Sequence, residues 1–437
     1  MKKTLFIFLL FANYSFASVI NVTNPGNGND IRANLVTAYN SAVDGDIITI
    51  PTGSFIITPP TVTITKKVSV VGTDSTNTIL IRSSATSDAS LSNVAMITFN
   101  GSTWSLSPSG VRVQGIRFKS KVPSVNDAGS DGLSLAADQG LTFINVSGFE
   151  VKLCSFWYFG NGGIRVQHRD YFARGLIHKC GFYLNAKGLT GLGLGYGIAI
   201  LGENLQWIPY INASGGNFIF IEDNIFRWHS HAIAAGGCGL YVSRYNKFYK
   251  NVISGNVSKH AIDGHGWQGG SLGGENYFST RMMITYMDTV INDIFFDRTT
   301  YVSNGTQSLD KPMERAILTR GGEAIMHHDY IRGYRLATTI SEDGSADPYP
   351  YDFGAGYNSG LTYPSTHTSN LAGTTASNSQ GNGDVWIYNI SYSIFDGSDG
   401  DGVSFYNYQP SDFLVDRDYH QAAKPNYTDF PYPHPNY

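Results

Sequence analysis

The sequence predicts an all-β chain that folds as a single-stranded right-handed parallel β-helix, a solenoid, with an N-terminal amphipathic capping helix. Two short patterns that alternate three times between residues 231 and 334 predict this fold. The first is a strand of small residues, as in His231-Ala-Ile-Ala-Ala. The second is a strand that ends on an apolar residue, as in Tyr241-Val-Ser-Arg-Tyr-Asn-Lys-Phe248. One alternation cannot bury its own apolar face, so successive coils must stack on each other.

Two columns of apolar residues support this stack. The column in the first pattern contains Leu133, Ile164, Ile198, Ile233, Ile262, Ile317 and Val403. The column that ends the second pattern contains Phe118, Phe156, Phe182, Phe226, Phe248, Val290, Ile331 and Phe395. Side chains alternate between the two faces of a strand, so both columns should line the interior. We therefore expect the β-helix to cover residues 67–407, with a loop rich in Ser, Thr, Gly and Asn at 359–383.

A third column precedes the second by two positions. It contains Cys154, Cys180, Asn224, Asn246, Asp288, Asp329 and Ser393. Short polar side chains at the turns of a β-helix can bond backbone groups of the next coil, so we interpret this column as a structural ladder. Metal binding by Asp288 and Asp329 is the alternative. The chain has 3 cysteines, too few for a disulfide framework, and we expect Cys154 and Cys180 to be buried, stacked thiols.

The N-terminal segment has the composition of an export signal. Residues 1–17 combine a positive start, an apolar stretch and a small-residue cleavage site, which predicts a secretory signal peptide cut after Ala17. The mature protein is then expected to be secreted, periplasmic or at the cell surface. The Tyr- and Pro-rich tail at 408–437 suits neither a helix nor a long strand, and we expect it to cover the last coil or lie loose.

Residues 18–66 are expected to form a cap and the first strands. Asp30 can act as the N-cap of a helix whose apolar residues have helical spacing. These residues are Ile31, Leu35, Ala38 and Ala42. A cap is needed because the first coil would otherwise expose a strand edge and an uncovered core.

The overall composition excludes several classes of function. Charged residues make up only 15% of the chain, and its formal net charge of −4 offers no basic surface for nucleic acid. No run after the signal approaches the ~20 apolar residues of a membrane span. The composition leaves the oligomeric state open.

Ionisable side chains gather on the predicted outer face of the first pattern. Strands of adjacent coils lie ~4.8 Å apart, so outward residues of neighbouring coils should form one cluster. This cluster consists of Asp263, His265 and Arg320. Arg165 and Gln167 extend this face upstream, and these two residues and Trp267 are candidates for contact with a substrate.

His231 and His260 have the same parity as the inward isoleucines of their strands. We therefore expect them to be strand-start residues bonded to the backbone, with contact to a substrate as the alternative. Asp263 can, in the same structural interpretation, hold His265 or a turn.

The second pattern has an outward column of its own, formed by Glu222, Arg244, Tyr286 and His327. In the structural interpretation, Arg244 and Glu222 of this column form a surface ion pair that contributes little to stability. His327 and His328 are adjacent on a strand and should face opposite ways, so we predict no metal site there.

Carboxylate, imidazole, guanidinium and phenol groups on a shallow face suit an elongated polysaccharide. A lyase needs a cation to neutralise a uronate carboxylate and a base to remove the C5 proton. Arg320 or Arg244 can be that cation, with His265 as the base and Tyr286 as the acid. A glycosidase needs two carboxylates that flank the bond, and the nearest pair is Asp263 and Glu222.

Two local motifs resemble those of the pectin-lyase-like β-helix superfamily. The stretch Asp44-Gly-Asp-Ile-Ile-Thr-Ile-Pro-Thr-Gly53, preceded by an amphipathic helix, resembles the N-terminal cap of pectate-lyase-like proteins. Gly264-His265-Gly266 resembles the Gly-His-Gly motif of polygalacturonase-type hydrolases, but the Asn-Thr-Asp and Asp-Asp motifs of that family are missing here. Only His265 can therefore be carried over. Pectate lyases of the superfamily bind calcium through a cluster of acidic residues. The sequence has no such cluster around Asp263, so the question of calcium as a cofactor stays open.

These features together predict a secreted protein that binds an acidic polysaccharide and cleaves it by lyase-type β-elimination. A non-catalytic adhesin or surface carbohydrate-binding β-helix is the first alternative, and a polygalacturonase-like glycoside hydrolase is the second. In an enzyme, loops should wall the Asp263 cluster, whereas an adhesin should leave it flat.

Overall fold

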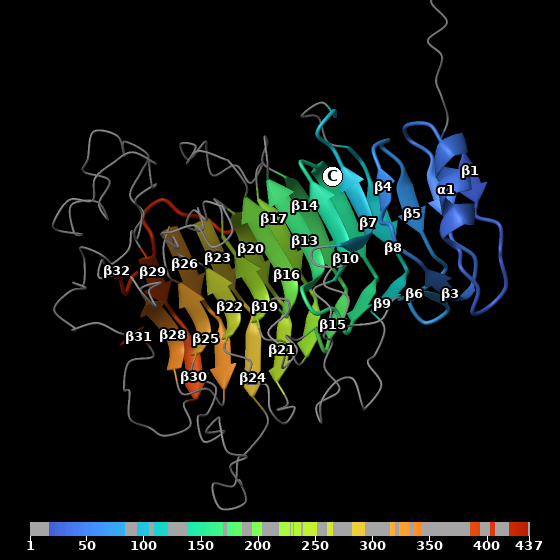
Figure 1. Ribbon diagram of the computed structural model, residues 1–437. Coiled ribbons are helices and arrows are strands. Elements are labelled where there is room, and N and C mark those ends of the chain that lie inside the picture. Colours follow the sequence, from blue (N-terminus) through green and yellow to red (C-terminus); the bar gives the residue numbers. More distant parts are fainter. Residues whose placement is uncertain are drawn as a thin grey trace, which may run out of the picture.

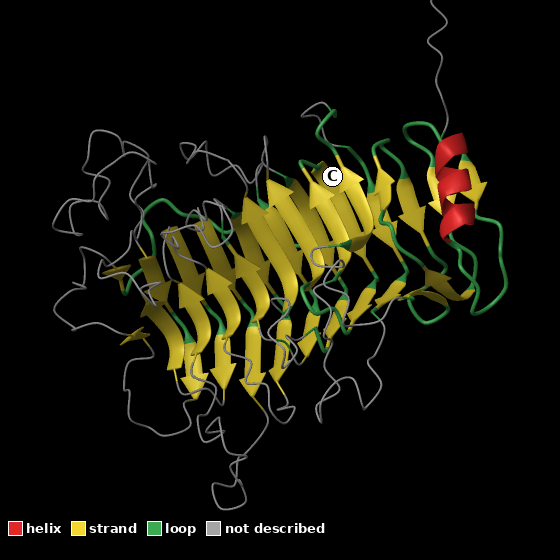
Figure 2. Cartoon of the chain, viewed as in Figure 1, coloured by secondary structure: helices red, strands yellow, loops and turns green. Residues whose placement is uncertain are grey.

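The structure of the protein is a computed structural model. It describes residues 17–83, 94–104, 109–120, 138–168, 173–185, 195–202, 218–227, 229, 231–236, 239–250, 260–264, 282–292, 315–319, 323–332, 336–341, 385–393, 403–406 and 419–435. Nearly all the regular structure in these residues is parallel β, as Figures 1 and 2 show. The loop at 359–383 and all but the last residue of the signal segment lie outside the described residues.

Three parallel sheets run along the stack. Sheet A has 12 strands: β1 (Val19–Asn21), β2 (Ile47–Thr49), β5 (Ser69–Val71), β8 (Arg112–Gln114), β11 (Ser147–Lys152), β14 (Arg174–His178), β17 (Ile219–Glu222), β20 (Leu240–Arg244), β23 (Met282–Tyr286), β26 (Glu323–His327), β29 (Val385–Tyr388) and β32 (Tyr419–His420). Sheet B has 10: β3 (Gly53–Ile57), β6 (Thr78–Arg82), β9 (Arg117–Lys119), β12 (Ser155–Trp157), β15 (Gly181–Tyr183), β18 (Ile225–Arg227), β21 (Lys247–Lys250), β24 (Thr289–Asn292), β27 (Tyr330–Arg332) and β30 (Ser391–Ser393). Sheet C also has 10: β4 (Val62–Ile64), β7 (Ala95–Asn100), β10 (Gln139–Ile144), β13 (Gly162–His168), β16 (Tyr196–Gly202), β19 (His231–Ala235), β22 (His260–Gly264), β25 (Arg315–Thr319), β28 (Leu336–Ser341) and β31 (Val403–Tyr406).

Each coil passes through sheets C, A and B in turn, as in β19, β20 and β21. Every strand pairs in parallel with the equivalent strand of the next coil, which is the architecture of a parallel β-helix. The predicted fold class is confirmed to this extent.

The predicted interior column of sheet C is correct over most of its length. Ile164, Ile198, Ile233, Ile262 and Ile317 follow one another in register and are buried. Two positions differ from the prediction. Ile164 pairs with Leu141 in the preceding coil rather than with Leu133, which lies outside the described residues. Thr338 stands between Ile317 and Val403, because one coil of this region lacks the small-residue pattern.

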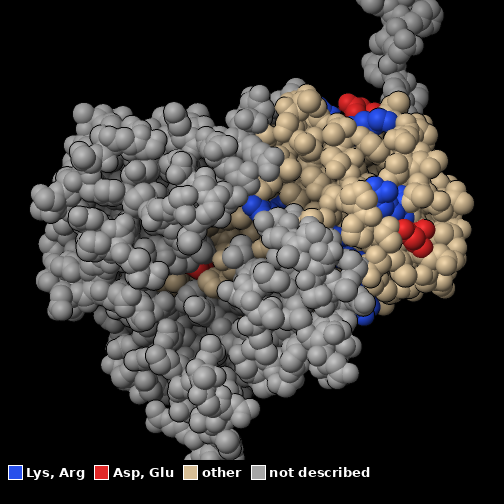
Figure 3. Space-filling model, viewed as in Figure 1, with Lys and Arg blue, Asp and Glu red and all other residues tan. Residues whose placement is uncertain are grey.

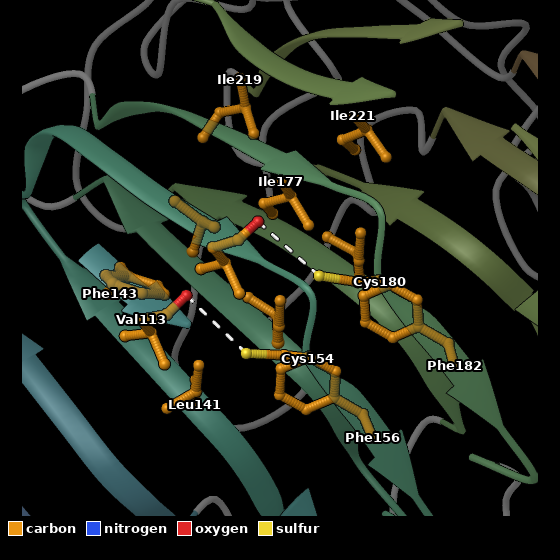
Figure 4. Close-up of a cluster of buried hydrophobic side chains, with 14 of the residues drawn as sticks. Val113, Leu141, Phe143, Cys154, Phe156, Ile177, Cys180, Phe182, Ile219 and Ile221 are labelled. Carbon is orange, nitrogen blue, oxygen red and sulfur yellow. Dashed lines mark hydrogen bonds between the residues drawn. The ribbon is translucent and has the colours of Figure 1, made fainter. Parts of the chain in front are cut away.

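The interior column of sheet B is a stack of phenylalanine rings. Phe156 and Phe182 stack with ring centroids 5.0 Å apart, and Phe182 and Phe226 with centroids 4.7 Å apart. Figure 4 shows Phe156 and Phe182 beside the two buried thiols. In register, Ile331 pairs with Tyr392, and the predicted Phe395 lies outside the described residues.

The polar ladder links successive coils through side-chain to backbone bonds at the turn from sheet A to sheet B. Asn246 Oδ1 accepts from the N–H of Asn224 at 3.0 Å, and Asp288 Oδ1 accepts from the N–H of Asn246 at 2.7 Å. Asp329 Oδ1 continues the series with the N–H of Asp288 at 2.9 Å. Because Tyr330 pairs with Ser391, the next rung is Ile390 and not Ser393. The structural interpretation of this ladder is therefore supported, apart from its last member.

The two described cysteines are buried free thiols, as expected. Cys154 and Cys180 occupy equivalent positions one coil apart, because their strands β12 and β15 pair in register. Each Sγ donates to a backbone carbonyl, that of Val113 at 3.7 Å and that of Val151 at 3.6 Å (Figure 4).

Helix α1 (Arg32–Ser41) lies at the β1 end of the stack (Figures 1 and 2). Leu35 and Ala38 are its buried residues, and they belong to the interior cluster together with Ile31 and Ala42. The N-cap is Ile31 rather than Asp30, although Asp30 Oδ1 accepts from the Arg32 N–H at 2.9 Å. That this helix closes the first coil stays a prediction.

The C-terminal tail folds back over the stack. β32 adds to the last strand of sheet A by pairing with β29. Residues 421–435, which we call the C-terminal strap, then run back across the outer face of sheet A toward β17 (Figure 1). The expectation that the tail covers the last coil was therefore incomplete, since the tail covers several coils.

The surface agrees with the low charge of the sequence. Figure 3 shows the charged side chains of the described part in small, separate groups on this face. Among the described residues, no helix is long and apolar enough to cross a membrane.

Candidate functional site

The strands of sheet C do not alternate strictly between inside and outside. Ala232 and Ile233 are consecutive, yet both belong to the interior cluster, as do Ala261 and Ile262. Ala234, in contrast, belongs to a separate cluster on the other side of the sheet. The strand therefore places His231 and Ala234 together on its outer face. The prediction that His231 shares the orientation of Ile233 is wrong for this reason.

His231 meets a carboxylate on that outer face. Its Nδ1 lies 2.8 Å from Oδ2 of Asp263, and the side chains are 11% and 0% exposed. The Tyr196 ring lies 5.1 Å from the imidazole. A carboxylate removed from water needs such a partner, because an unpaired buried charge is costly. Asp263 thus lies where its carboxylate can stabilise a protonated imidazole.

The structure describes only some of the predicted partners of Asp263. His265, Arg320 and Trp267 lie outside the described residues. The backbone of His260 pairs with that of His231, but its side chain is not described. The Asp263–His265–Arg320 cluster therefore stays a prediction. Sequence reasoning missed the His231–Asp263 pair because it assumed strict alternation.

The same outer column continues toward the N-terminus through two alanines to Arg165. Arg165, Ala199, Ala234 and Asp263 follow one another in register. Arg165 and Gln167 point away from the interior, as predicted, because Ile164 and Val166 are the inward residues of β13.

This outer face is nevertheless closed to solvent in its described part. Arg165 is 7% exposed and Gln167 5%, and Ala234 and Asp263 are fully buried. The expectation of a shallow, solvent-facing groove at these positions is therefore wrong.

The predicted outward column of sheet A is present as a continuous row. Glu222, Arg244, Tyr286 and His327 pair in register from β17 to β26. Arg244 Nε donates to Glu222 Oε2 at 2.7 Å, and its Nη1 donates to the Tyr286 hydroxyl at 2.6 Å. The rings of Tyr286 and His327 stack with centroids 4.9 Å apart.

The C-terminal strap buries this row. Arg244 donates from Nη1 to the carbonyl of Phe430 and from Nη2 to that of Pro431, each at 2.8 Å. His327 Nε2 lies 3.1 Å from Oδ1 of Asp429. Arg244 is 0% exposed, so the expectation of a surface ion pair is wrong.

Burial also sets the protonation states of the row. Burial lowers the pKa of His327 to about 4, although Asp429 acts in the opposite direction. Burial raises the pKa of Tyr286 to about 12, although the Arg244 guanidinium opposes this. At neutral pH the imidazole is therefore neutral and the phenol protonated.

The two sets of predicted site residues lie on different sheets. Asp263 and His231 are on the outer face of sheet C, whereas Arg244 and Tyr286 are on the outer face of sheet A. A single lyase site that combines Asp263 with Arg244 and Tyr286 does not fit this arrangement. Asp263 and Glu222 also lie on different faces, which speaks against them as the two carboxylates of a glycosidase.

His327 and His328 do meet, contrary to the prediction. His328 has a φ of 54°, and this left-handed turn conformation brings its Nδ1 to 2.8 Å from Nδ1 of His327. Within the described ranges, however, no group of three or more His, Cys, Asp or Glu side chains could hold a metal ion.

A buried ion pair that sequence reasoning missed lies beside sheet C. Arg82 Nε is 3.2 Å from Oδ2 of Asp138, with side-chain exposures of 3% and 0%. The Ser120 hydroxyl donates to the same carboxylate at 2.6 Å. Burial raises the pKa of Asp138, although Arg82 counteracts it. The Asp138 carbonyl accepts from the Asn161 N–H at 3.0 Å, so we assign this pair a structural role.

Comparison with models of protein families gave no match, and comparison with curated proteins gave none either. Several solved structures are similar. An alginate lyase from Paenibacillus sp. str. FPU-7 has a TM-score of 0.46 and 10% identity, with 86% of this chain and 95% of that chain covered. The pectin methylesterase PemA from Erwinia chrysanthemi has a TM-score of 0.38 and 11% identity, with 91% and 96% covered. A pectate lyase has a TM-score of 0.36 and 10% identity, with 89% and 79% covered.

Likenesses of this degree support no conclusion about activity. The parallel β-helix follows from the three parallel sheets of this chain itself. The resemblance expected from the sequence thus holds at the level of the fold.

Proposed function

We propose that this chain is an exported protein that binds an acidic polysaccharide across the strands of sheet C and cleaves it by β-elimination at His231 and Asp263. The observation that carries the proposal is an imidazole 2.8 Å from a fully buried carboxylate outside the interior of the stack. A structural coil has no need of this pair, since Ala234 and Ala199 fill the neighbouring outer positions.

His231 would act as the base. Nδ1 of His231 lies beside the carboxylate of Asp263, and Nε2 would take the C5 proton of a uronate. The electrons of that C–H bond form the C4–C5 double bond, and the C4–O bond breaks. The leaving oxygen then takes a proton from an acid, a role for which His265 is the candidate. A paired carboxylate raises the basicity of an imidazole and stabilises its protonated form.

Arg165 would supply a positive charge beneath the polysaccharide farther along the same column. It lies three coils from Asp263, about 14 Å at the usual spacing of parallel strands. That distance suits an elongated ligand that lies across the strands and meets a cation away from the cleavage point. Arg320, predicted on this face, is the candidate for neutralising the uronate at the cleavage point itself.

The test is the appearance of the unsaturated-uronate absorbance when the mature protein is incubated with alginate, polygalacturonate and other acidic polysaccharides, with and without calcium. His231→Asn and Asp263→Asn should each lower the rate by ~10²–10⁴-fold. The matched control is His178→Asn on sheet A, because His178 makes a similar contact with Glu150, with Nε2 3.0 Å from Oε1. This control should leave the rate unchanged.

A product that forms equally fast with His231→Asn would contradict the role of this pair. If neither unsaturated product nor new reducing ends appear, the proposed lyase activity is wrong. Export can be tested separately, by mass spectrometry of the secreted chain for cleavage after Ala17.

A further inference from the structure

We propose that the outer face of sheet A beneath the C-terminal strap is a second saccharide site, specific for a neutral, hydroxyl-rich oligosaccharide, and that the strap is its displaceable occupant. This site is separate from the one proposed on sheet C, and the two proposals do not depend on each other.

The strap offers this face the same kinds of polar group that a sugar chain offers. Two neutral carbonyl oxygens accept from the Arg244 guanidinium. The Tyr432 hydroxyl donates to Asp223 Oδ1 at 2.7 Å, and the His434 N–H donates to Glu222 Oε1 at 3.2 Å. Ring and hydroxyl oxygens of a sugar can replace the carbonyls, and sugar hydroxyls can replace the two donors.

Aromatic and apolar side chains complete the face. The Tyr432 ring stacks on Tyr245 with centroids 3.8 Å apart, and Phe430 meets Phe220 edge-on at 5.3 Å. Around Phe220 lies a row of outward apolar residues on sheet A, which includes Val242 and Ile284. Ligand sites commonly combine such an apolar lining with a few polar groups that fix orientation.

The charges of this face select a neutral ligand. With the strap removed, Glu222 and Asp223 stand beside the guanidinium of Arg244 and, one coil earlier, beside Lys179. Two coils from Glu222, Lys152 Nζ is 3.0 Å from Glu150 Oε1, so these two charges balance each other. The face therefore has no excess of positive charge to hold a uronate, whereas a neutral sugar would find both donors and acceptors.

The strap is held by side-chain and carbonyl contacts and not by a sheet ladder. Its residues form no strand or helix within 421–435, and its prolines, such as Pro431 and Pro433, lack the N–H that a sheet ladder needs. The Asp429 side chain is 50% exposed, and Tyr432 is 42% exposed. A ligand that displaces the strap therefore has to replace these contacts but no ladder of backbone hydrogen bonds.

The test uses the full chain with a specific protease site placed in the exposed linker at Ala422 and Ala423. Cleavage leaves the strap held by its non-covalent contacts alone. Gel filtration and mass spectrometry then show whether it dissociates, and calorimetry measures the affinity of cut and uncut protein for cellohexaose, maltohexaose, mannohexaose and hexagalacturonate. We expect the strap to dissociate and at least one neutral hexasaccharide to bind about tenfold or more tightly than to the uncut protein.

Two variants locate the site. Tyr245→Ala in the cut protein should abolish the gain in affinity, because it removes the stacking platform. Tyr183→Ala, on sheet B, removes a comparable ring, which stacks on Trp157 with centroids 4.2 Å apart, and should leave the gain unchanged.

The proposal is overturned if the cut strap stays bound through gel filtration, or if it leaves and no neutral hexasaccharide binds. Tighter binding of hexagalacturonate than of the neutral sugars would also overturn it. Loss of the native circular dichroism spectrum on cleavage would show that the strap is a structural element and not a displaceable occupant.

Discussion

His231 Nδ1 lies 2.8 Å from Oδ2 of Asp263, although the two residues belong to neighbouring coils and do not pair in register. The contact exists because Ala232 and Ile233 both turn inward, which leaves His231 on the same outer face as the strand position that Asp263 occupies. When two consecutive residues both face inward, the first of them must have a small side chain. The small side chains of this pattern therefore have a structural cause.

Gly197 holds the first of these two inward positions in a neighbouring coil. Replacing it with a larger residue should destabilise the stack. A Cβ on Gly197 would lie 2.5 Å from the carbonyl oxygen of Ala232, a backbone atom that cannot easily move. We expect Gly197→Ala to lower the free energy of unfolding by ~1–3 kcal/mol. Gly162→Ala is the matched control on the same sheet, because its nearest neighbour is 3.6 Å away. Urea denaturation should separate the two variants, and equal midpoints would contradict the steric argument.

Asp288 should make stability depend on pH. Burial raises its pKa to about 7, and hydrogen bonds from Ser243 and Asn246 only partly oppose this. Since the unfolded value is ~3.9, the folded chain binds the extra proton between these values, and stability falls as pH rises from about 4 to about 7. Asp288→Asn, which copies the amide of Asn246 on the preceding rung, should remove this fall and be more stable than wild type at pH 8.

Asp74 should give stability the opposite pH dependence and therefore serves as a control. Hydrogen bonds from Asn77 and Thr76 lower its pKa to about 2. Its contribution is present above the unfolded value and is lost as pH falls toward 2, so Asp74→Asn should destabilise at neutral pH. Unfolding curves of both variants across pH decide the matter. An Asp288→Asn variant with the pH dependence of wild type would refute the assignment.

His327 should act in the acid range. Burial lowers its pKa to about 4 from an ordinary value of 6.5. The folded state therefore favours the neutral imidazole, and its contribution to stability is present above pH 6.5 and lost as pH falls to 4. His327→Gln should lessen the loss of stability between these pH values. Hydrogen exchange of the strap amides at pH 5 and 7 would show whether the strap loosens with it, and identical pH profiles would contradict this prediction.

The pair of Arg244 and Glu222 should show strong coupling. Arg244→Met leaves the buried Glu222 carboxylate without its guanidinium and should cost ~3–5 kcal/mol. The double variant with Glu222→Gln should cost less than Arg244→Met alone, because no unpaired charge remains. Thermal unfolding of the two single variants and the double variant completes the cycle. Additive effects would mean that the 2.7 Å contact contributes little.

Helix α1 allows a test of the capping role. Leu35 is fully buried in the interior cluster, so Leu35→Asp places a carboxylate in an apolar environment. We expect faster hydrogen exchange in β2 and β3 and little change in β20, because each coil contacts only its neighbours. Thr37→Asp, on the exposed side of the same helix, is the control. Unchanged exchange in β2 and β3 would argue against a cap.

The interior of the stack could be predicted well because it repeats. Phe182 and Phe226 have the same neighbours one coil apart, so a column that recurs in the sequence recurs in space. The prediction failed where the repeat changes. Ser393 was assigned to the ladder by its distance from Phe395, but the register of β30 places Ile390 there instead.

The candidate sites were predicted less well. The row from Glu222 to His327 followed from register and is present. Its burial did not follow, because Pro431 reaches Arg244 from 187 residues away in the sequence. Strict alternation also misplaced His231, since a single extra inward residue reverses the outward face of a strand.

The sequence by itself determined the parallel β-helix, because inward apolar residues that recur coil after coil can be buried only by stacking. It also determined which residues share a row on each sheet. Only the tertiary structure decided which other segments of the chain contact those rows. The partner of His231 depends on a local departure from alternation, and the environment of Arg244 depends on a strap that returns from the far end of the chain. Both are contacts between segments that no local pattern relates, so only the packed chain reveals them.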